Sequence, residues 1–173
     1  MNENFDASFD LVMKHEGGFV NNPKDPGGMT NLGVTRKAWE DYVGHAVDEL
    51  TMRSLDIKQV KPFYKKRYWD VIKGDELQIG LDYCCFDLAV NSGTGRAAKF
   101  LQLAAGISAD GAIGPLTLIA VNRHPAEELI VKVCDERIHF LQGLDTFTVF
   151  GKGWSRRVTE VRDKALEMSN GNG

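Results

Sequence analysis

Near its start, the chain passes from a helical pattern directly into a segment rich in glycine and proline. Four residues have the i, i+3, i+4, i+7 spacing that places side chains on one helix face: Phe9, Val12, Met13 and Glu16. We expect this helix to begin at an N-cap, Ser8 or Asp6, and to end at Gly17-Gly18. Glu16 would then lie in the last turn, at the end of an apolar stripe.

This expected position favours the protonated form of Glu16. Neighbouring apolar side chains remove water from the carboxyl group, and the negative end of the helix dipole lies close by; both effects raise its pKa. A carboxylic acid that keeps its proton near neutral pH can act as a general acid. The alternative is a glutamate at a helix end that points to solvent.

Turn-forming residues follow the helix in two clusters, Asn21-Asn22-Pro23 and Asp25-Pro26-Gly27-Gly28. Runs beside them are suited to a small β-ribbon: Phe19-Val20 and Leu32-Gly33-Val34-Thr35. Asp25 and Thr30 would lie on its arms or at its tip, where they could face Glu16. Two carboxyl groups across a short hairpin suit the cleavage of a glycosidic bond. Taken alone, Asp25 is the cap of its own turn and Thr30 is an ordinary strand residue.

The whole run from Glu16 to Thr35 resembles the signature of the family-108 glycoside hydrolases. It reads Glu-Gly-Gly and then Asn-Pro-Lys-Asp-Pro-Gly-Gly-Met-Thr-Asn-Leu-Gly-Val-Thr. Members of that family are N-acetylmuramidases with a lysozyme-like fold, found among phage endolysins and bacterial toxin-secretion accessory proteins. The resemblance implies that Glu16 is the catalytic acid. It also implies catalytic roles for Asp25 and Thr30, in a Glu–Asp–Thr order similar to the triad of phage-type lysozymes.

A second motif, Ala109-Asp110-Gly111-Ala112-Ile113-Gly114-Pro115-Leu116-Thr117, resembles the predicted peptidoglycan-binding segment that follows the catalytic part in this family. We therefore expect a lysozyme-like catalytic part in residues 1–93. A helical peptidoglycan-binding part in residues 94–173 would pack on it, so that the two form one compact unit.

The activity that the resemblance implies is hydrolysis of the β-1,4 bond between N-acetylmuramic acid and N-acetylglucosamine. Glu16 would protonate the glycosidic oxygen. Asp25 would stabilise the oxocarbenium-like sugar or, with Thr30, hold the attacking water. Carboxyl groups about 6.5–9.5 Å apart indicate an inverting enzyme, and about 5–5.5 Å a retaining one. Analogy with phage-type lysozymes favours inversion.

Aromatic and basic residues alternate in the segment that contains Tyr64, Tyr68 and Trp69. Aromatic rings can stack on sugar faces, so we take these three as candidate substrate-binding residues. The alternative is that the rings pack in the core while the lysines between them are solvated. A further family motif, Asp87-Leu88-Ala89-Val90-Asn91-Ser92-Gly93, resembles a cleft segment and implies a substrate contact for Asn91.

The remaining segments favour a mainly α fold. Expected helical regions are 50–72, 81–90, 96–105, 115–122, 125–142 and 154–168. The apolar run Leu81–Val90 contains Asp82 and Asp87, and a charge in such a helix is either paired or functional. The odd set of Cys84, Cys85 and Cys134 indicates buried thiols and synthesis in a reducing cytoplasm.

The formal net charge of −3 gives no electrostatic case for nucleic acid or for an anionic membrane. The four histidines lie far apart in the sequence, so we expect neither a metal nor another cofactor. We expect a monomer with no signal peptide and no membrane-spanning segment. It would reach the peptidoglycan glycan strands after lysis or through a partner's membrane pore, such as a holin.

Two other functions remain open. The chain could be a non-catalytic peptidoglycan-binding or secretion accessory protein. It could also be an amidase or peptidase acting on the peptide stems, although that chemistry usually requires a metal or a nucleophile paired with a base.

Overall fold

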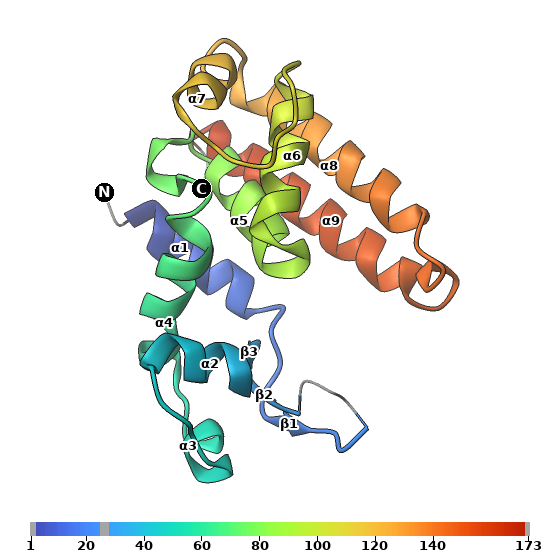
Figure 1. Ribbon diagram of the computed structural model, residues 1–173. Coiled ribbons are helices and arrows are strands. Elements are labelled where there is room, and N and C mark those ends of the chain that lie inside the picture. Colours follow the sequence, from blue (N-terminus) through green and yellow to red (C-terminus); the bar gives the residue numbers. More distant parts are fainter. Residues whose placement is uncertain (1–2, 25–27, 172–173) are drawn as a thin grey trace. The chain divides into compact units, whose positions relative to one another are not determined.

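Helices make up most of the chain in the computed structural model, which describes residues 3–24 and 28–171 (Figure 1). A small antiparallel ribbon of three short strands follows the first helix. The predicted mainly α fold with a β-ribbon after the first helix is therefore confirmed. No helix within the described ranges is long and apolar enough to cross a bilayer.

The backbone divides into two compact units, which we describe separately. One is Phe9–Arg67, and the other combines Met1–Ser8 with Tyr68–Gly173. These boundaries concern packing, whereas the expected division into residues 1–93 and 94–173 concerns function. The functional division therefore stays a prediction.

Helix α1 (Glu3–Met13) begins and ends earlier than predicted. The proposed N-caps were wrong, because Asp6 and Ser8 both lie inside the helix and Ser8 is fully buried. Beyond Met13, the next three backbone N–H groups each donate to the carbonyl three residues back, at 3.3, 3.0 and 3.3 Å. Glu16 is the last of these donors. It therefore lies in a tightened turn just after the helix, and not in its last α-helical turn.

The unit Phe9–Arg67 contains the ribbon and a set of short helices. Its elements are β1 (Val20–Asn21), β2 (Met29–Asn31), β3 (Val34–Thr35), α2 (Arg36–Val43), α3 (Glu49–Arg53) and α4 (Ile57–Tyr64). A π-helical segment, Lys65–Trp69, continues α4. The helical region expected over residues 50–72 is therefore divided among α3, α4 and this segment, and Pro62 lies inside α4. Side chains cap α2, α3 and α4 at Thr35, Asp48 and Asp56.

The ribbon has the order β1-β2-β3, with Thr30 paired to Val20 on one side and to Thr35 on the other. Leu32 and Gly33 were expected in a strand but form the two-residue turn between β2 and β3. Their φ angles are 50° and 76°, the combination of a type I′ hairpin turn. Met29–Asn31 takes the central position instead.

The second unit is built around helix α5 (Leu81–Ser92), which is buried along most of its length. Helices α6, α8 and α9 pack against it, and α8 and α9 lie side by side (Figure 1). The bounds are α6 (Thr94–Ala104), α7 (Pro115–Val121), α8 (Ala126–Gln142) and α9 (Phe147–Ser169), with a 3-10 turn at Gly74–Glu76. All three cysteines are buried free thiols, as predicted.

The two aspartates of α5 are stabilised in different ways. Asp87 is fully buried and accepts from Arg137 at 2.7 Å and from Arg157 at 2.9 Å. Burial alone would raise its pKa, but the two guanidinium groups outweigh it and hold the pKa of Asp87 below its usual range. Asp82, also fully buried, accepts backbone N–H groups at one oxygen, from Tyr83 at 2.7 Å and Gly80 at 2.9 Å, and the Asn4 side chain is a further hydrogen-bond partner.

Burial raises the pKa of Asp82 from 3.8 to about 6, because the hydrogen bonds from Tyr83, Gly80 and Asn4 offset only part of the lost hydration. The protonated carboxyl therefore stabilises the fold. This contribution is complete below the unfolded-state pKa near 4 and is lost as pH rises through about 6.

We predict that Asp82→Asn will remove this pH dependence, because an amide keeps the accepting oxygen but does not ionise. As pH rises from about 4 to about 7, the free energy of unfolding of the wild type should fall relative to the variant by up to about 3 kcal/mol. Chemical denaturation at several pH values measures this difference. Asp135→Asn, at an exposed position of α8, is the control, and a pH-independent difference for Asp82→Asn would contradict the account.

Candidate active site

Glu16 is half-buried in the turn that follows α1. Gly33, the second residue of the β2–β3 turn, lies directly against its carboxyl group. A Cβ atom at position 33 would come within 2.5 Å of Glu16 Oε2 and 2.9 Å of Glu16 Cδ. Distances this short are overlaps, so the hairpin approaches the carboxyl closely only because residue 33 is glycine.

Tyr64 of α4 also lies against Gly33. Its hydroxyl would also overlap a Cβ atom at position 33, so the tyrosine oxygen and the Glu16 carboxyl both adjoin Gly33. The ring is buried, and the hydroxyl donates to the Leu32 carbonyl at 2.7 Å. This hydrogen bond ties the end of α4 to a turn whose Leu32 has a positive φ, uncommon for a residue with a side chain.

Aromatic packing fixes the Tyr64 ring. Phe9 of α1 meets it edge-on with centroids 5.5 Å apart, and Phe63 does so at 5.7 Å. Edge-to-face pairs of this kind stabilise a defined ring orientation. Helix α1 therefore contributes to the site twice: Phe9 orients Tyr64, and the turn after the helix carries Glu16.

Side-chain contacts hold the ribbon and the residue before it against α3. The buried Asn31 side chain donates to the Met52 carbonyl at 2.8 Å. Arg53 lies over the Phe19 ring, with its guanidinium carbon 4.1 Å from the ring centroid. Both contacts restrain the segments that leave Glu16 and return to Gly33.

The other predicted catalytic residues are Thr30, which lies within the described part of the chain, and Asp25. Thr30 is half-exposed on the central strand, between the two buried residues Met29 and Asn31. Because side chains alternate along a strand, Thr30 points to the opposite face of the ribbon. Asp25 lies outside the described residues.

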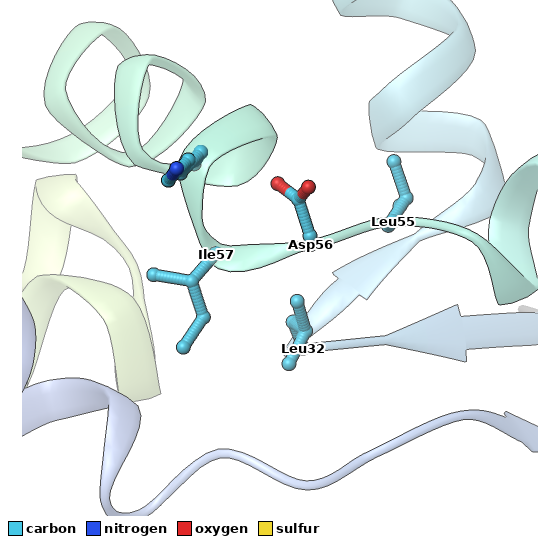
Figure 2. Close-up of a pocket in the computed structure, with 5 residues that line it drawn as sticks. Leu32, Leu55, Asp56 and Ile57 are labelled. Atoms are coloured by element: carbon cyan, nitrogen blue, oxygen red, sulfur yellow. The ribbon is translucent and has the colours of Figure 1, made fainter.

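An apolar hollow of about 460 Å³ adjoins the strained turn (Figure 2). Leu32, Leu55 and Ile57 line it, together with Asp56 and Lys58. The Asp56 carboxylate points away from Leu32 in Figure 2 and caps α4 by accepting from the Gln59 N–H at 2.8 Å. Its role is therefore structural, and the hollow offers mainly apolar contacts beside the hairpin.

The candidate substrate-binding rings have different environments. Trp69 is fully buried, donates through Nε1 to Asp75 at 2.9 Å, and meets Phe5 and Phe86 edge-on at 5.4 Å each. This burial favours the packing alternative for Trp69. Tyr64 is buried as well, and only Tyr68 of the three is partly exposed.

Asn91 is exposed near the end of α5, and Arg137 holds its side chain. Arg137 Nη2 donates to Asn91 Oδ1 at 3.2 Å, while Nη1 of the same arginine binds Asp87. Since arginine only donates, the Asn91 amide must turn its oxygen toward Arg137 and its NH₂ group away. The charge of Asp87 in an apolar helix indicated a paired or a functional group, but nothing local in the sequence identified Arg137 or Arg157.

Hydrogen bonds within the loop and to Gln102 of α6 hold the motif at residues 109–117 in place. Asp110 Oδ1 accepts from Ala112 N–H at 3.0 Å and from Gln102 Nε2 at 2.8 Å. The buried Gln102 also donates to Thr117 Oγ1 at 3.1 Å and accepts from Gly111 N–H at 3.0 Å. These hydrogen bonds connect the loop to α6 and so position the start of α7.

Comparisons with known proteins agree with this arrangement. A family model described as Glycosyl hydrolase 108 matches residues 9–93, and one described as Predicted Peptidoglycan domain matches residues 96–159. No protein in a search of curated sequences matches significantly. The solved structure of SagA from Brucella abortus has a TM-score of 0.87 and 40% identity, covering 98% of this chain and 97% of that one.

These similarities confirm the lysozyme-like fold and support a role as a peptidoglycan hydrolase that also binds its substrate. They support glycoside hydrolase activity on peptidoglycan as the kind of chemistry. With a similarity to SagA that extends along nearly the whole chain, the protein belongs to the glycosyl hydrolase 108 family.

Proposed function

We propose that this protein is an N-acetylmuramidase that hydrolyses the β-1,4 bond between N-acetylmuramic acid and N-acetylglucosamine, with Glu16 as general acid. One observation carries the proposal: the half-buried Glu16 carboxyl and the Tyr64 hydroxyl both lie against Gly33, where a Cβ atom would overlap each of them. A carboxyl group held in this way, in a member of a glycosidase family, is suited to donate a proton.

Glu16 is half-buried, and the tight turn that carries it follows the C-terminal end of α1. Tyr64 serves as a positioning residue, because its buried ring and its bond to Leu32 fix the hydroxyl beside the carboxyl. Rigid positioning of this kind is a large part of what an enzyme contributes to rate.

In the proposed reaction, the Glu16 proton moves to the glycosidic oxygen as its bond to the muramic acid anomeric carbon breaks. Positive charge develops on that sugar, and a water molecule attacks the anomeric carbon and loses a proton. We assign Asp25 and Thr30 to this second half: Asp25 accepts the proton or stabilises the charge, and the Thr30 hydroxyl holds the water. This assignment favours inversion.

Sugar contacts are proposed for Asn91 and Tyr68. The NH₂ group of Asn91, turned away from Arg137, is suited to donate to an acetamido carbonyl. Tyr68 is partly exposed and offers a ring to a sugar face. Trp69 is not assigned to substrate, because its ring is fully buried.

Peptidoglycan is the partner that the family models support. We also propose that the protein acts as a monomer and reaches the wall after lysis or through a pore such as a holin. A non-catalytic peptidoglycan-binding role is the alternative, and the experiments below separate it from catalysis.

We predict that Glu16→Gln will lower the rate of peptidoglycan hydrolysis by about 10²–10⁴-fold, because glutamine cannot donate the proton. Mass spectrometry of muropeptide digests measures the loss. The thermal unfolding temperature should stay close to that of the wild type. Glu76→Gln, at an exposed glutamate, is the control, and activity of Glu16→Gln within a few-fold of the wild type would refute the assignment.

The stereochemical course tests the roles of Asp25 and Thr30. If water attacks directly, proton NMR recorded during early turnover should show the α-anomer of the newly formed reducing muramic acid. Asp25→Asn should then lose nearly as much activity as Glu16→Gln. A β-anomer as first product would identify a retaining enzyme and exclude the proposed role of Thr30 in holding the attacking water.

We predict that Gly33→Ala will lower activity at least about ten-fold, because the new methyl group displaces the Glu16 carboxyl or the Tyr64 hydroxyl. Gly44→Ala is a matched control: it has a similar positive φ of 85°, but a Cβ there would meet nothing within 4 Å. Both variants strain the backbone, and only the first crowds the site. Equal loss in the two would show that backbone strain alone is responsible.

A further inference from the structure

The apolar hollow beside the β2–β3 turn lies within the unit Phe9–Arg67, as Glu16 does. We call it the turn hollow; its lining residues are Leu32, Leu55, Asp56, Ile57 and Lys58 (Figure 2). Leu32 directly precedes Gly33, so its Cα lies about 3.8 Å from that of the residue that adjoins the Glu16 carboxyl. The volume of about 460 Å³ falls within the range of about 300–1,000 Å³ that is usual for small-molecule pockets. The turn hollow therefore has the size and the position to hold a further group of the substrate whose bond Glu16 would protonate.

Two apolar side chains of the hollow occupy positions where other residues would cost less free energy. Leu32 has a φ of 50° at the first central position of a type I′ turn, where asparagine, aspartate and glycine are preferred. Ile57 begins α4 and is 50% exposed, although isoleucine is among the residues most often buried. Residues held in unfavourable backbone conformations cluster at binding and active sites. The leucine at this position therefore points to a use for its side chain.

Lys58 places a positive charge at the hollow. Its side chain is exposed, and it is the second residue of α4, where the positive end of the helix dipole adds to its own charge. The Asp56 carboxylate points away from Leu32 and accepts from the Gln59 N–H at 2.8 Å (Figure 2). Residues 57–69 contain no acidic residue and five basic ones: Lys58, Lys61, Lys65, Lys66 and Arg67. The hollow therefore suits a ligand group that combines methyl groups with a carboxylate.

We propose that the turn hollow binds the peptide stem of a muramic acid residue next to the cleaved bond. This inference rests on the proposed function and specifies its substrate as a glycan whose muramic acid carries a stem. The stem starts with two methyl-bearing groups, the lactyl ether and alanine, and continues with a glutamate carboxylate. The methyl groups contact Leu32, Leu55 and Ile57, and the carboxylate pairs with Lys58.

The direct test is a binding measurement with N-acetylmuramoyl-L-alanyl-D-glutamate, which carries the start of the stem but has no glycosidic bond to cleave. Methyl NMR of the full-length protein should show saturable shifts at Leu32, Leu55 and Ile57. N-acetylglucosamine, which lacks the lactyl group and the stem, should leave these signals unchanged. Because no bond is broken, the result does not depend on catalysis by Glu16.

Two substitutions at the hollow and two matched controls make this measurement specific. Ile57→Ser and Lys58→Gln should each raise the Kd of the fragment about ten-fold, because each removes one of the proposed contacts. Leu50→Ser removes an apolar side chain that is 72% exposed on α3, and Lys37→Gln removes an exposed lysine on α2. Both controls should bind the fragment as the wild type does.

Leu32→Asn separates the role of the side chain from that of the turn. Asparagine adopts a positive φ more readily than leucine, so the variant should unfold at a temperature no lower than that of the wild type. Its Kd for the fragment should nevertheless rise about ten-fold, because the apolar contact is lost. An unchanged Kd in this variant would assign Leu32 a purely structural role and contradict the proposal.

Hydrolysis should reflect the same contacts. The comparison uses glycan oligomers of equal length with and without peptide stems. In Lys58→Gln, the ratio of kcat/KM for the stem-bearing oligomer to that for the stem-free one should fall about ten-fold. In Lys37→Gln, the ratio should equal that of the wild type.

Several results would overturn the proposal. Saturable shifts that are absent from Leu32, Leu55 and Ile57 up to the solubility limit of the fragment would exclude the hollow. Equal shifts with N-acetylglucosamine would show that it binds the sugar and not the stem. A dimer that is lost in Ile57→Ser, with fragment binding unchanged, would make the hollow an interface between copies.

The two proposals of this article can fail separately. Fragment binding at the hollow without hydrolysis of any glycan would count against the proposed function alone. Hydrolysis that proceeds equally on stem-bearing and stem-free glycans, with no fragment bound at the hollow, would count against the stem site alone.

Discussion

The close approach of a β-hairpin to a carboxyl group positions the proposed catalytic acid of this protein. Gly33 has no side chain, and this absence lets Glu16 and Tyr64 reach the same point from different segments. The type I′ turn requires positive φ at two residues, and Leu32 accepts that conformation with its carbonyl bound by Tyr64. The turn, the tyrosine and the acid therefore depend on one another, which is the preorganisation that proton transfer requires.

In the second unit, a buried charged group holds several helices together. Asp87 is satisfied by Arg137 and Arg157, which join α5, α8 and α9. Removing one partner of such a group usually costs about 3–5 kcal/mol, because it leaves a buried charge uncompensated. Arg137 also orients Asn91, so the charge network that stabilises the helices also fixes an exposed amide.

Local signals in the sequence predicted the helical class and the ribbon, because glycine, proline and apolar spacing act over a few residues. They failed where packing outweighed them. Helix α1 extends back past Ser8 because Phe5 is buried against Trp69 and Phe86, and α9 includes Gly151 because the Phe147 ring covers it. The pairing of Tyr64 with the Gly33 turn joins distant positions and has no local signal.

The most direct test of the central claim is a crystal structure of the Glu16→Gln variant with an uncleaved muramic acid–glucosamine oligosaccharide bound. The account predicts that the amide of residue 16 lies about 3 Å from a glycosidic oxygen that links muramic acid to glucosamine, with the Tyr64 hydroxyl still bonded to the Leu32 carbonyl. A bound oligosaccharide whose glycosidic oxygens all lie beyond hydrogen-bonding reach of residue 16 would contradict it.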